Sequence, residues 1–238
     1  TDEFPGHLNF LQEVDNPGAQ FPYLSGNLDF SGDGDLGALF TDQILPNDDF
    51  ESDLTSARDD VNDPAFRGSD SRDDKIAQAT TIEVDDGMGG TDRIGVIGAT
   101  TQIIATITSS GDVTETSSNG TNDMAALAAV LQPQVDALIA DGVNKIILVS
   151  HLQQLALEQE LAGLLDGVDV IIAGGADTRL ADSQDRLRAG DVAEGDYPVQ
   201  ATDASGNPVL IVSTDGEYSY VGRLVVTFAD DGVVDLPS

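Results

Sequence analysis

Two aliphatic runs near the middle of the chain flank a stretch with helical spacing. The runs cover residues 144–150 and 168–173, and the helical stretch between them covers 152–165. Short continuous apolar runs that end at turn residues are typical of strands buried on both faces of a parallel sheet. The pattern therefore predicts a β-α-β unit with parallel strands and a right-handed crossover.

A longer amphipathic stretch precedes this unit. Residues 121–141 have the pattern of a helix, with Thr121 or Asn122 as its N-cap and Gly142 as its stop. Pro133 lies inside this stretch. Because proline lacks the N–H that the helical ladder needs, we expect it to kink the helix or divide it in two.

The remaining patterns predict strands, a short helix and a loop. The stretch TTIEVDDGMGGTDRIGVIGAT predicts a hairpin around its glycines, and FPYLSGNLDF predicts a short strand. The tail from residue 208 predicts antiparallel strands with turns at TDGE and ADDG. Phe4, Leu8 and Leu11 have the spacing of a short helix, whereas residues 46–75 are acidic and predict an irregular loop or insertion. Together these elements predict an α/β fold with a mixed sheet and a C-terminal antiparallel hairpin.

The net charge of the chain limits the classes of partner and the environments that suit it. Asp and Glu number 43 against 10 Lys and Arg, a formal net charge of -33. Such a chain repels nucleic-acid polymers and anionic membranes, and none of its aliphatic runs is long enough to span a bilayer. The aliphatic pattern excludes an entirely disordered acidic chain, which leaves a surface adapted to seawater-like salt or a secreted, calcium-rich protein. With no cysteine for a disulfide or a thiolate metal site, we expect an extracellular, periplasmic or cell-surface protein of a bacterium.

Candidate chemistry gathers at the ends of the two predicted parallel strands. His151 directly follows the first strand, and the second ends in Gly174-Gly175-Ala176-Asp177-Thr178. Ligands of α/β sheets bind beyond the carboxyl ends of the strands, where an imidazole suits transition metals and a carboxylate suits Mg, Ca or Mn. The alternatives are a polar strand-end histidine that bonds a loop carbonyl, and a tight turn that Asp177 caps.

A second candidate metal site lies near the N-terminus. DFSGDGDLGALF begins like an EF-hand loop, but Phe40 stands at the twelfth position, where that loop needs a bidentate glutamate. The EF-hand interpretation therefore fails. A looser calcium site formed by Asp29, Asp33 and Asp35 and a plain acidic turn remain as the two interpretations of this stretch.

Five stretches in order resemble the calcineurin-like metallophosphoesterases, and among them the 5'-nucleotidase branch: FPYLSGNLDF, DRIGVIGATT, NKIILVSHL, GVDVIIAGG and NPVLIVSTDGEYSYVGRLVVTF. The resemblance implies part of a four-layer α/β/β/α sandwich that holds two divalent metal ions and hydrolyses phosphate esters such as nucleotides. By the same resemblance His151 is a metal ligand. LQQLALEQELAGLL further resembles a secreted, cyanobacterial-type subgroup.

Two departures from the family pattern affect the expected site. The family's Gly-Gly-His-x-His-Thr motif is here Gly174-Gly175-Ala176-Asp177-Thr178, so both imidazoles are absent, and Asp177 with a carboxylate oxygen or Thr178 with a hydroxyl is the remaining candidate ligand. The family's Asp-x-His, Gly-Asp and Gly-Asn-His-Glu motifs precede the counterpart of FPYLSGNLDF, and none occurs before that stretch here; TDEFPGHLNFLQ resembles the start of the helix that comes after them. We therefore expect residues 1–238 to be a single metallophosphoesterase-like domain without its N-terminal portion, in which His7 has no ligand role.

Two functional hypotheses arise from the resemblance and its departures. In the first, the chain is part of a longer metal-dependent phosphoric ester hydrolase of the 5'-nucleotidase and alkaline phosphatase kind, and is inactive alone. In the second, it is a degenerate, non-catalytic module of an acidic extracellular or surface assembly. Either way, one sheet would lack its partners, so we expect association with the missing N-terminal half or with other chains.

Overall fold

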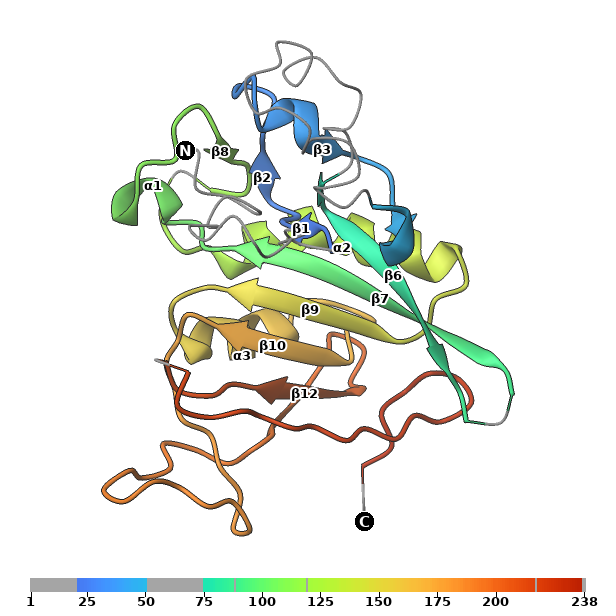
Figure 1. Ribbon diagram of the computed structural model, residues 1–238, viewed down its shortest axis with the longest axis vertical. Helices are drawn as coiled ribbons and strands as arrows, with labels where there is room; N and C mark the ends of the chain where they lie inside the picture. Colours follow the sequence, from blue (N-terminus) through green and yellow to red (C-terminus); the bar gives the residue numbers. More distant parts are fainter. Residues whose placement is uncertain (1–20, 51–74, 88, 119, 217, 237–238) are drawn as a thin grey trace, which may run out of the picture.

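A mixed seven-stranded sheet organises the molecule in this computed structural model, which describes residues 21–50, 75–87, 89–118, 120–216 and 218–236 (Figure 1). The strand order is β11-β12-β10-β9-β7-β6-β4. The four central strands β7, β9, β10 and β12 are parallel to one another. At the two sides, β11 pairs antiparallel with β12 and β6 pairs antiparallel with β7, while the outermost strand β4 pairs in parallel with β6. The bounds are β4 Leu45–Pro46, β6 Ala79–Asp85, β7 Thr91–Thr100, β9 Ile146–His151, β10 Val170–Gly174, β11 Val199–Thr202 and β12 Pro208–Val212.

The predicted β-α-β unit is confirmed. Strand β9 pairs in parallel with β10, and α3 (Leu155–Ala162) connects them. The hairpin around the glycine-rich stretch is also confirmed, since β6 and β7 pair antiparallel from Ala79↔Ile97 to Asp85↔Thr91.

Helix α2 (Met124–Ala140) corrects two sequence-based expectations. Its N-cap is Asp123, whose carboxylate accepts a hydrogen bond from the N–H of Ala126 at 3.0 Å, and neither of the two preceding residues plays that part. The helix is also not divided at Pro133, which lies on its exposed side. Burial of the opposite side holds the helix together across the missing hydrogen bond, because packing outweighs one lost ladder bond.

The main core lies between the sheet and the two helices that cover one of its faces (Figure 1). Leu127, Leu131 and Leu138 of α2 are completely buried against strand residues such as Ile97 and Ile171. Over the opposite face of the sheet, the described residues place no helix. Central side chains there are partly accessible, with Val149 41% and Ile172 42% exposed. The sheet is thus apolar on both faces, as parallel strands usually are, but only one face is fully covered.

Two small sheets pack beside the large one. The strands β1 (Tyr23–Leu24), β5 (Ile76–Ala77) and β3 (Phe40–Thr41) form one of them, and β2 (Leu28–Asp29) pairs with β8 (Thr114–Glu115) in the other. A Cβ added at Gly98 of β7 would lie 2.1 Å from the main-chain oxygen of Leu24, so only glycine permits this contact. The stretch 21–30 therefore forms two short strands of different sheets, where the pattern predicts one. Short helices η1 (Gly37–Leu39), η2 (Asn47–Asp49) and α1 (Ile104–Ile107) complete the described elements.

The C-terminal part differs from the prediction in one respect. The ADDG turn is present, with Ala229 N–H donating to the Val233 oxygen at 2.8 Å, but the stretch after TDGE forms no ladder. Both edges of β12 are already paired, with β10 on one side and β11 on the other. The antiparallel hairpin is therefore β11–β12. The predicted N-terminal helix at residues 4–11, His7 and most of the predicted loop at 46–75 lie outside the described residues.

Candidate functional site

Three parallel strands end at the same level of the large sheet and bring the candidate residues to one edge. The register aligns Thr100 of β7 with His151 of β9, and His151 with Gly174 of β10. Buried Asn27 fixes the end of β7, because its amide both donates to the Thr100 oxygen and accepts from the Thr100 N–H, each at 2.8 Å. This is the edge at which α/β folds place their ligands.

The imidazole of His151 is exposed and lies against the bend that follows β10. A Cβ added at Gly175 would be 2.6 Å from both Nε2 and Cδ2 of His151, and one at Gly174 would be 3.7 Å from Nδ1. Gly175 also has a φ of +77°, in the region that favours glycine. Gly175 thus lets the bend pass directly beside the imidazole ring, while Gly174 leaves room for the main-chain oxygen of Ser150, which an added Cβ would approach to 2.8 Å.

A buried carboxyl lies behind the turn that follows His151. Glu158 of α3 is completely buried, and its Oε1 accepts from the hydroxyl of Ser150 at 3.0 Å and from the N–H of Leu152 at 3.3 Å. Burial raises the pKa of Glu158, and the hydrogen bonds to Oε1 oppose that effect. The turn also places Gln153 at a φ of +76°.

Asp177 lies two strand ends away from the end of β7 and projects from the loop after β10. Its φ is +49°, and a Cβ added at Gly216 would be 2.8 Å from its Oδ1, so its carboxylate lies against the loop after β12. Thr178 donates within its own loop, to the oxygen of Ala176 at 3.2 Å. Asp177 lines a cavity of about 650 Å³ on the open face of the sheet, but His151 does not line it.

This cavity is apolar along the sheet and polar at the strand ends. Ile147 and Ile172 of the sheet face it, and Leu224, Val226 and Phe228 of the C-terminal segment close one side. The polar end is formed by the carboxylates of Asp177 and Asp215 and by the neighbouring Ser213 and Thr214.

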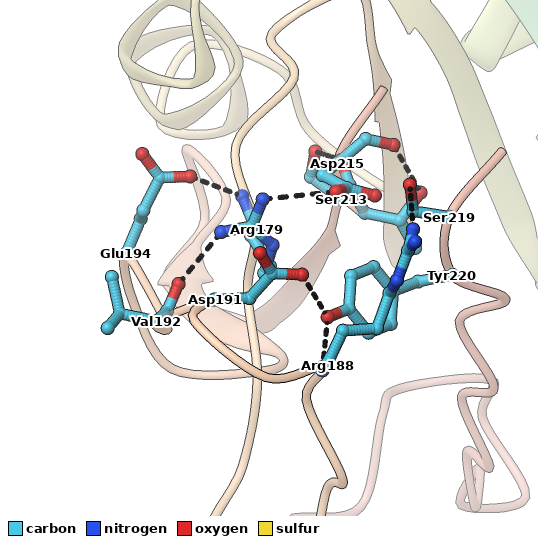
Figure 2. Close-up of polar contacts among 10 residues, drawn as sticks. Arg179, Arg188, Asp191, Val192, Glu194, Ser213, Asp215, Ser219 and Tyr220 are labelled. Carbon is cyan, nitrogen blue, oxygen red and sulfur yellow. Dashed lines mark hydrogen bonds and ion pairs between the residues drawn. The ribbon is translucent and has the colours of Figure 1, made fainter. Parts of the chain in front are cut away.

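An ion pair joins the loops after β10 and β12 at this polar end (Figure 2). The guanidinium of Arg179 is 3.1 Å from Oδ2 of Asp215, and the two side chains are only 20% and 12% exposed. Arg179 also donates to the oxygen of Val192 at 3.1 Å, while its N–H donates to Glu194 at 2.8 Å. The hydrogen bond to Asp215 raises the pKa of the Arg179 guanidinium, which stays charged.

A second set of contacts fastens the loop between β10 and β11 to the C-terminal segment (Figure 2). The hydroxyl of Tyr220 donates to Asp191 at 2.5 Å and accepts from the N–H of Arg188 at 2.7 Å, and Arg188 donates to the hydroxyl of Ser219 at 3.0 Å. Desolvation, followed by the bond to Asp191, raises the pKa of the Tyr220 hydroxyl. The ring of Tyr220 lies 5.7 Å from the guanidinium carbon of Arg179, so the two sets are contiguous.

Sequence comparison finds 5'-nucleotidases and a related enzyme. The snake venom 5'-nucleotidase of Naja atra is 30% identical over 145 residues, 61% of this chain and 25% of that protein. The 5'-nucleotidase of Rattus norvegicus is 35% identical over 104 residues, 44% of this chain and 18% of that protein. The apyrase of Anopheles gambiae is 30% identical over 171 residues, 68% of this chain and 27% of that protein. No family model matches the chain.

Two solved structures share the fold of this chain. The 5'-nucleotidase precursor of Thermus thermophilus superposes with a TM-score of 0.59 at 24% identity, over 91% of this chain and 32% of that one. The NAD nucleotidase of Haemophilus influenzae gives 0.57 at 23% identity, over 91% and 33%. The chain belongs to the 5'-nucleotidase-like metallophosphoesterase family. It spans about a quarter of the length of the curated relatives it matches, consistent with the C-terminal half of a phosphoesterase domain.

The described part of this 5'-nucleotidase-like chain does not complete a metal site by itself. Within residues 21–50 and 75–236, apart from the few uncertain positions, no three His, Asp or Glu side chains gather as a metal-binding group. His151 and Asp177 come from neighbouring strand ends without a third ligand. In the acidic stretch considered for calcium, Asp29, Asp33 and Asp35 form no such group, and Asp29 and Asp33 accept hydrogen bonds from N–H groups of their own turn.

Sequence reasoning missed three residues of this 5'-nucleotidase-like edge. Glu158 has the spacing of a buried position on α3, one helical turn before Leu161, but a charged residue is rarely assigned there. Arg179 and Asp215 are 36 residues apart, and nothing local in either stretch indicates their pairing. The only sequence signal was that each follows a parallel strand, which places both at the same edge.

Proposed function

We propose that this chain forms the C-terminal part of the catalytic domain of a metal-dependent phosphoric ester hydrolase that acts on nucleotides. The observation that carries the proposal is His151 at the end of β9, beside the glycine bend, in a chain whose relatives are 5'-nucleotidases. The resemblance to secreted relatives, together with the absence of cysteine, supports a location outside the cytoplasm. Among the described helices, none is both long and apolar enough to cross a membrane.

Within this proposal the chain supplies a minority of the metal ligands. His151 offers an imidazole nitrogen and Asp177 offers carboxylate oxygens, and both belong to loops at the ligand-binding edge. Two divalent ions in such a site polarise the phosphate and lower the pKa of a bound water. The other ligands would come from chain beyond these residues, so we expect residues 1–238 alone to be inactive.

The open face of the sheet supports an association with that further chain. Val149 and Ile172 lie centrally on this face and remain 41% and 42% exposed, and the cavity beside them is lined mainly by aliphatic side chains. Covering such a face removes apolar surface from water, which stabilises the assembly by about 25 cal/mol for each Å² buried. We propose that the remaining part of the phosphoesterase domain, or another chain, packs here.

The test uses the full-length protein and a nucleoside monophosphate as substrate. We expect phosphate release that depends on added Mn²⁺, Zn²⁺ or Mg²⁺, and a loss on the order of 100-fold in His151→Ala. The matched control is His7→Ala, which removes the only other histidine and should leave the rate unchanged. Equal rates in the two histidine variants would contradict the ligand role of His151, and no release in any metal would contradict hydrolase activity.

One observation favours the alternative, a non-catalytic module. The loop that carries two histidines in the family is fastened here by the ion pair Arg179–Asp215. The Asp215 carboxylate is therefore already paired with a cation of the protein. A scaffold needs only this fixed loop and no metal. Under this alternative Asp177→Asn and His151→Ala leave assembly with the rest of the protein intact, and the full-length protein releases no phosphate.

A further inference from the structure

The turn that carries His151 has a conformation that its sequence does not favour. Gln153 has a φ of +76°, in the left-handed region where side chains other than Gly, Asn and Asp are uncommon. Such conformations persist only where the surroundings determine them, and they cluster at functional sites. Something besides local preference must therefore hold the turn between β9 and α3.

The carboxyl of Glu158 is placed to hold it. One oxygen, Oε1, accepts from Ser150 at 3.0 Å and from Leu152 at 3.3 Å, the residues immediately before and after His151. Glu158 is completely buried and Leu152 is 1% exposed, so both ends of this contact are fixed within the core. The backbone of His151 is thereby held from both sides by a single atom.

Burying this carboxyl carries a cost that packing alone does not explain. Its second oxygen, Oε2, is buried and has no hydrogen-bond partner among the described residues. A buried polar atom without a partner is unfavourable, and an aliphatic side chain of similar size would fill the same space without that cost. The N-cap residue Gln154 makes no side-chain cap to α3, so the carboxyl also lies in an otherwise uncapped first turn.

The imidazole ring itself lies against the bend that follows β10. Gly175 lies so close that an added Cβ would be 2.6 Å from Nε2, and Gly174 is paired with His151 in the sheet register. The Glu158 carboxyl thus positions the backbone on either side of His151, and the glycine bend limits the rotation of the imidazole ring.

We propose that Glu158 is the positioning residue for His151: by bonding Ser150 and Leu152 it sets the imidazole against the Gly174–Gly175 bend at the ligand-binding edge. The importance of this placement rests on the proposed function, in which His151 is a metal ligand. The placement itself does not, and the two are tested by different measurements.

The test compares two substitutions of Glu158 by NMR in the full chain. Glu158→Gln keeps the shape and an acceptor oxygen, whereas Glu158→Leu keeps the volume and removes both oxygens. Glu160→Leu is the matched control, because Glu160 is exposed on the same helix. The chain has two histidines, so His7→Gln assigns the ring protons of His151. The readout is the nuclear Overhauser contact between these protons and the Hα protons of Gly175.

We expect this contact in the wild type, in Glu158→Gln and in Glu160→Leu, and its loss in Glu158→Leu with the fold retained by circular dichroism. Rescue by the conservative variant separates positioning from bulk packing. An unchanged contact and unchanged ring shifts in Glu158→Leu overturn the proposal. If Glu158→Leu does not fold, Ser150→Ala decides: a weakened contact supports the proposal and an unchanged contact overturns it.

A separate titration addresses the metal role of His151. Added Mn²⁺ broadens the ring protons of a histidine that binds it, so wild-type full-length protein should show broadening at His151 and not at His7. Absence of broadening, with the positioning results as expected, contradicts the ligand role and leaves the role of Glu158 standing. Broadening at His151 together with an unchanged contact to Gly175 in Glu158→Leu supports the ligand role of His151 and contradicts the positioning role of Glu158.

Discussion

Asp169 makes the stability of the sheet depend on pH in a direction opposite to that of most carboxylates. Its carboxylate accepts from the N–H of Ile146 at 2.7 Å where β10 begins, and its main chain bonds Ile146 and Leu210 on either side. The pKa of Asp169 is raised from 3.8 to about 7, chiefly by burial and also by the nearby Asp203, against the opposing effects of the Ile146 N–H and Lys145. The neutral carboxyl is thus the form that the folded chain prefers.

The sign of the effect follows from the two pKa values. In the unfolded chain Asp169 loses its proton near pH 3.8, while the folded chain retains it up to about pH 7. The folded state therefore binds more protons across this window, and stability falls as the pH rises through it. The difference corresponds to about 4 kcal/mol, at about 1.4 kcal/mol for each pH unit. Because the side chain is only half-buried, water screens part of this, and we expect about 2 kcal/mol.

Asp169→Asn tests this reasoning directly. The amide oxygen can still accept from the Ile146 N–H, but it cannot ionise. We expect the variant to be more stable than wild type by about 2 kcal/mol at pH 8 and equal to it near pH 4. The measurement is urea unfolding across that range in moderate salt, which limits repulsion within a chain of net charge -33.

The control for the change in net charge is Asp166→Asn. Asp166 is exposed three residues earlier, so its substitution removes the same formal charge without relieving burial. If Asp169→Asn follows Asp166→Asn at every pH, or gains its stability at low pH, the account of Asp169 is refuted.

Three further substitutions test packing and pairing by urea unfolding. Arg179→Met should lower the urea midpoint, because it leaves the buried carboxylate of Asp215 without its partner. In a chain that already carries Asp215→Asn, the same substitution should lower the midpoint by less than half as much; additive losses would contradict the pairing. Gly98→Ala should cost at least about 2 kcal/mol because its Cβ would meet a main-chain oxygen of β1, whereas Gly34→Ala, with open space around it, should change stability by less than about 0.5 kcal/mol. Pro133→Ala should stabilise α2 by about 1 kcal/mol through the restored N–H, and a loss would show that the proline is needed there.

The regular part of the fold was predictable because its signals are local. Continuous aliphatic runs identify β9 and β10, and the glycine-rich stretch identifies the β6–β7 hairpin. Strand β11 reads Val-Gln-Ala-Thr and has no such signal, because an edge strand that is half exposed is defined mainly by its partner β12. The two-residue strands β1 and β2 are defined in the same way, by pairing with segments far along the chain.

The candidate site was predictable only in its location. A histidine that follows a buried strand must lie at the strand-end edge, so the place of His151 follows from the β-α-β pattern. The contacts that fix its side chain depend on burial and on distant partners. A glutamate in the first turn of a helix is usually exposed to solvent, where its carboxylate interacts favourably with the positive end of the helix dipole. Nothing local in the sequence shows that Glu158 is completely buried instead.

The two candidate ligands are held by protein groups, which bears on how the altered motif should be interpreted. His151 follows a strand held through Glu158 and lies against Gly175, while the loop of Asp177 is tied to the next strand end by Arg179–Asp215. Both backbones are held by contacts within the described protein. Loss of the family's two histidines therefore need not disorder this edge, because the ion pair ties the two loops together without them. If His151 binds metal as proposed, we expect metal binding and folding to be separable here, so a variant that loses metal at His151 while keeping its fold would report on ligand chemistry alone.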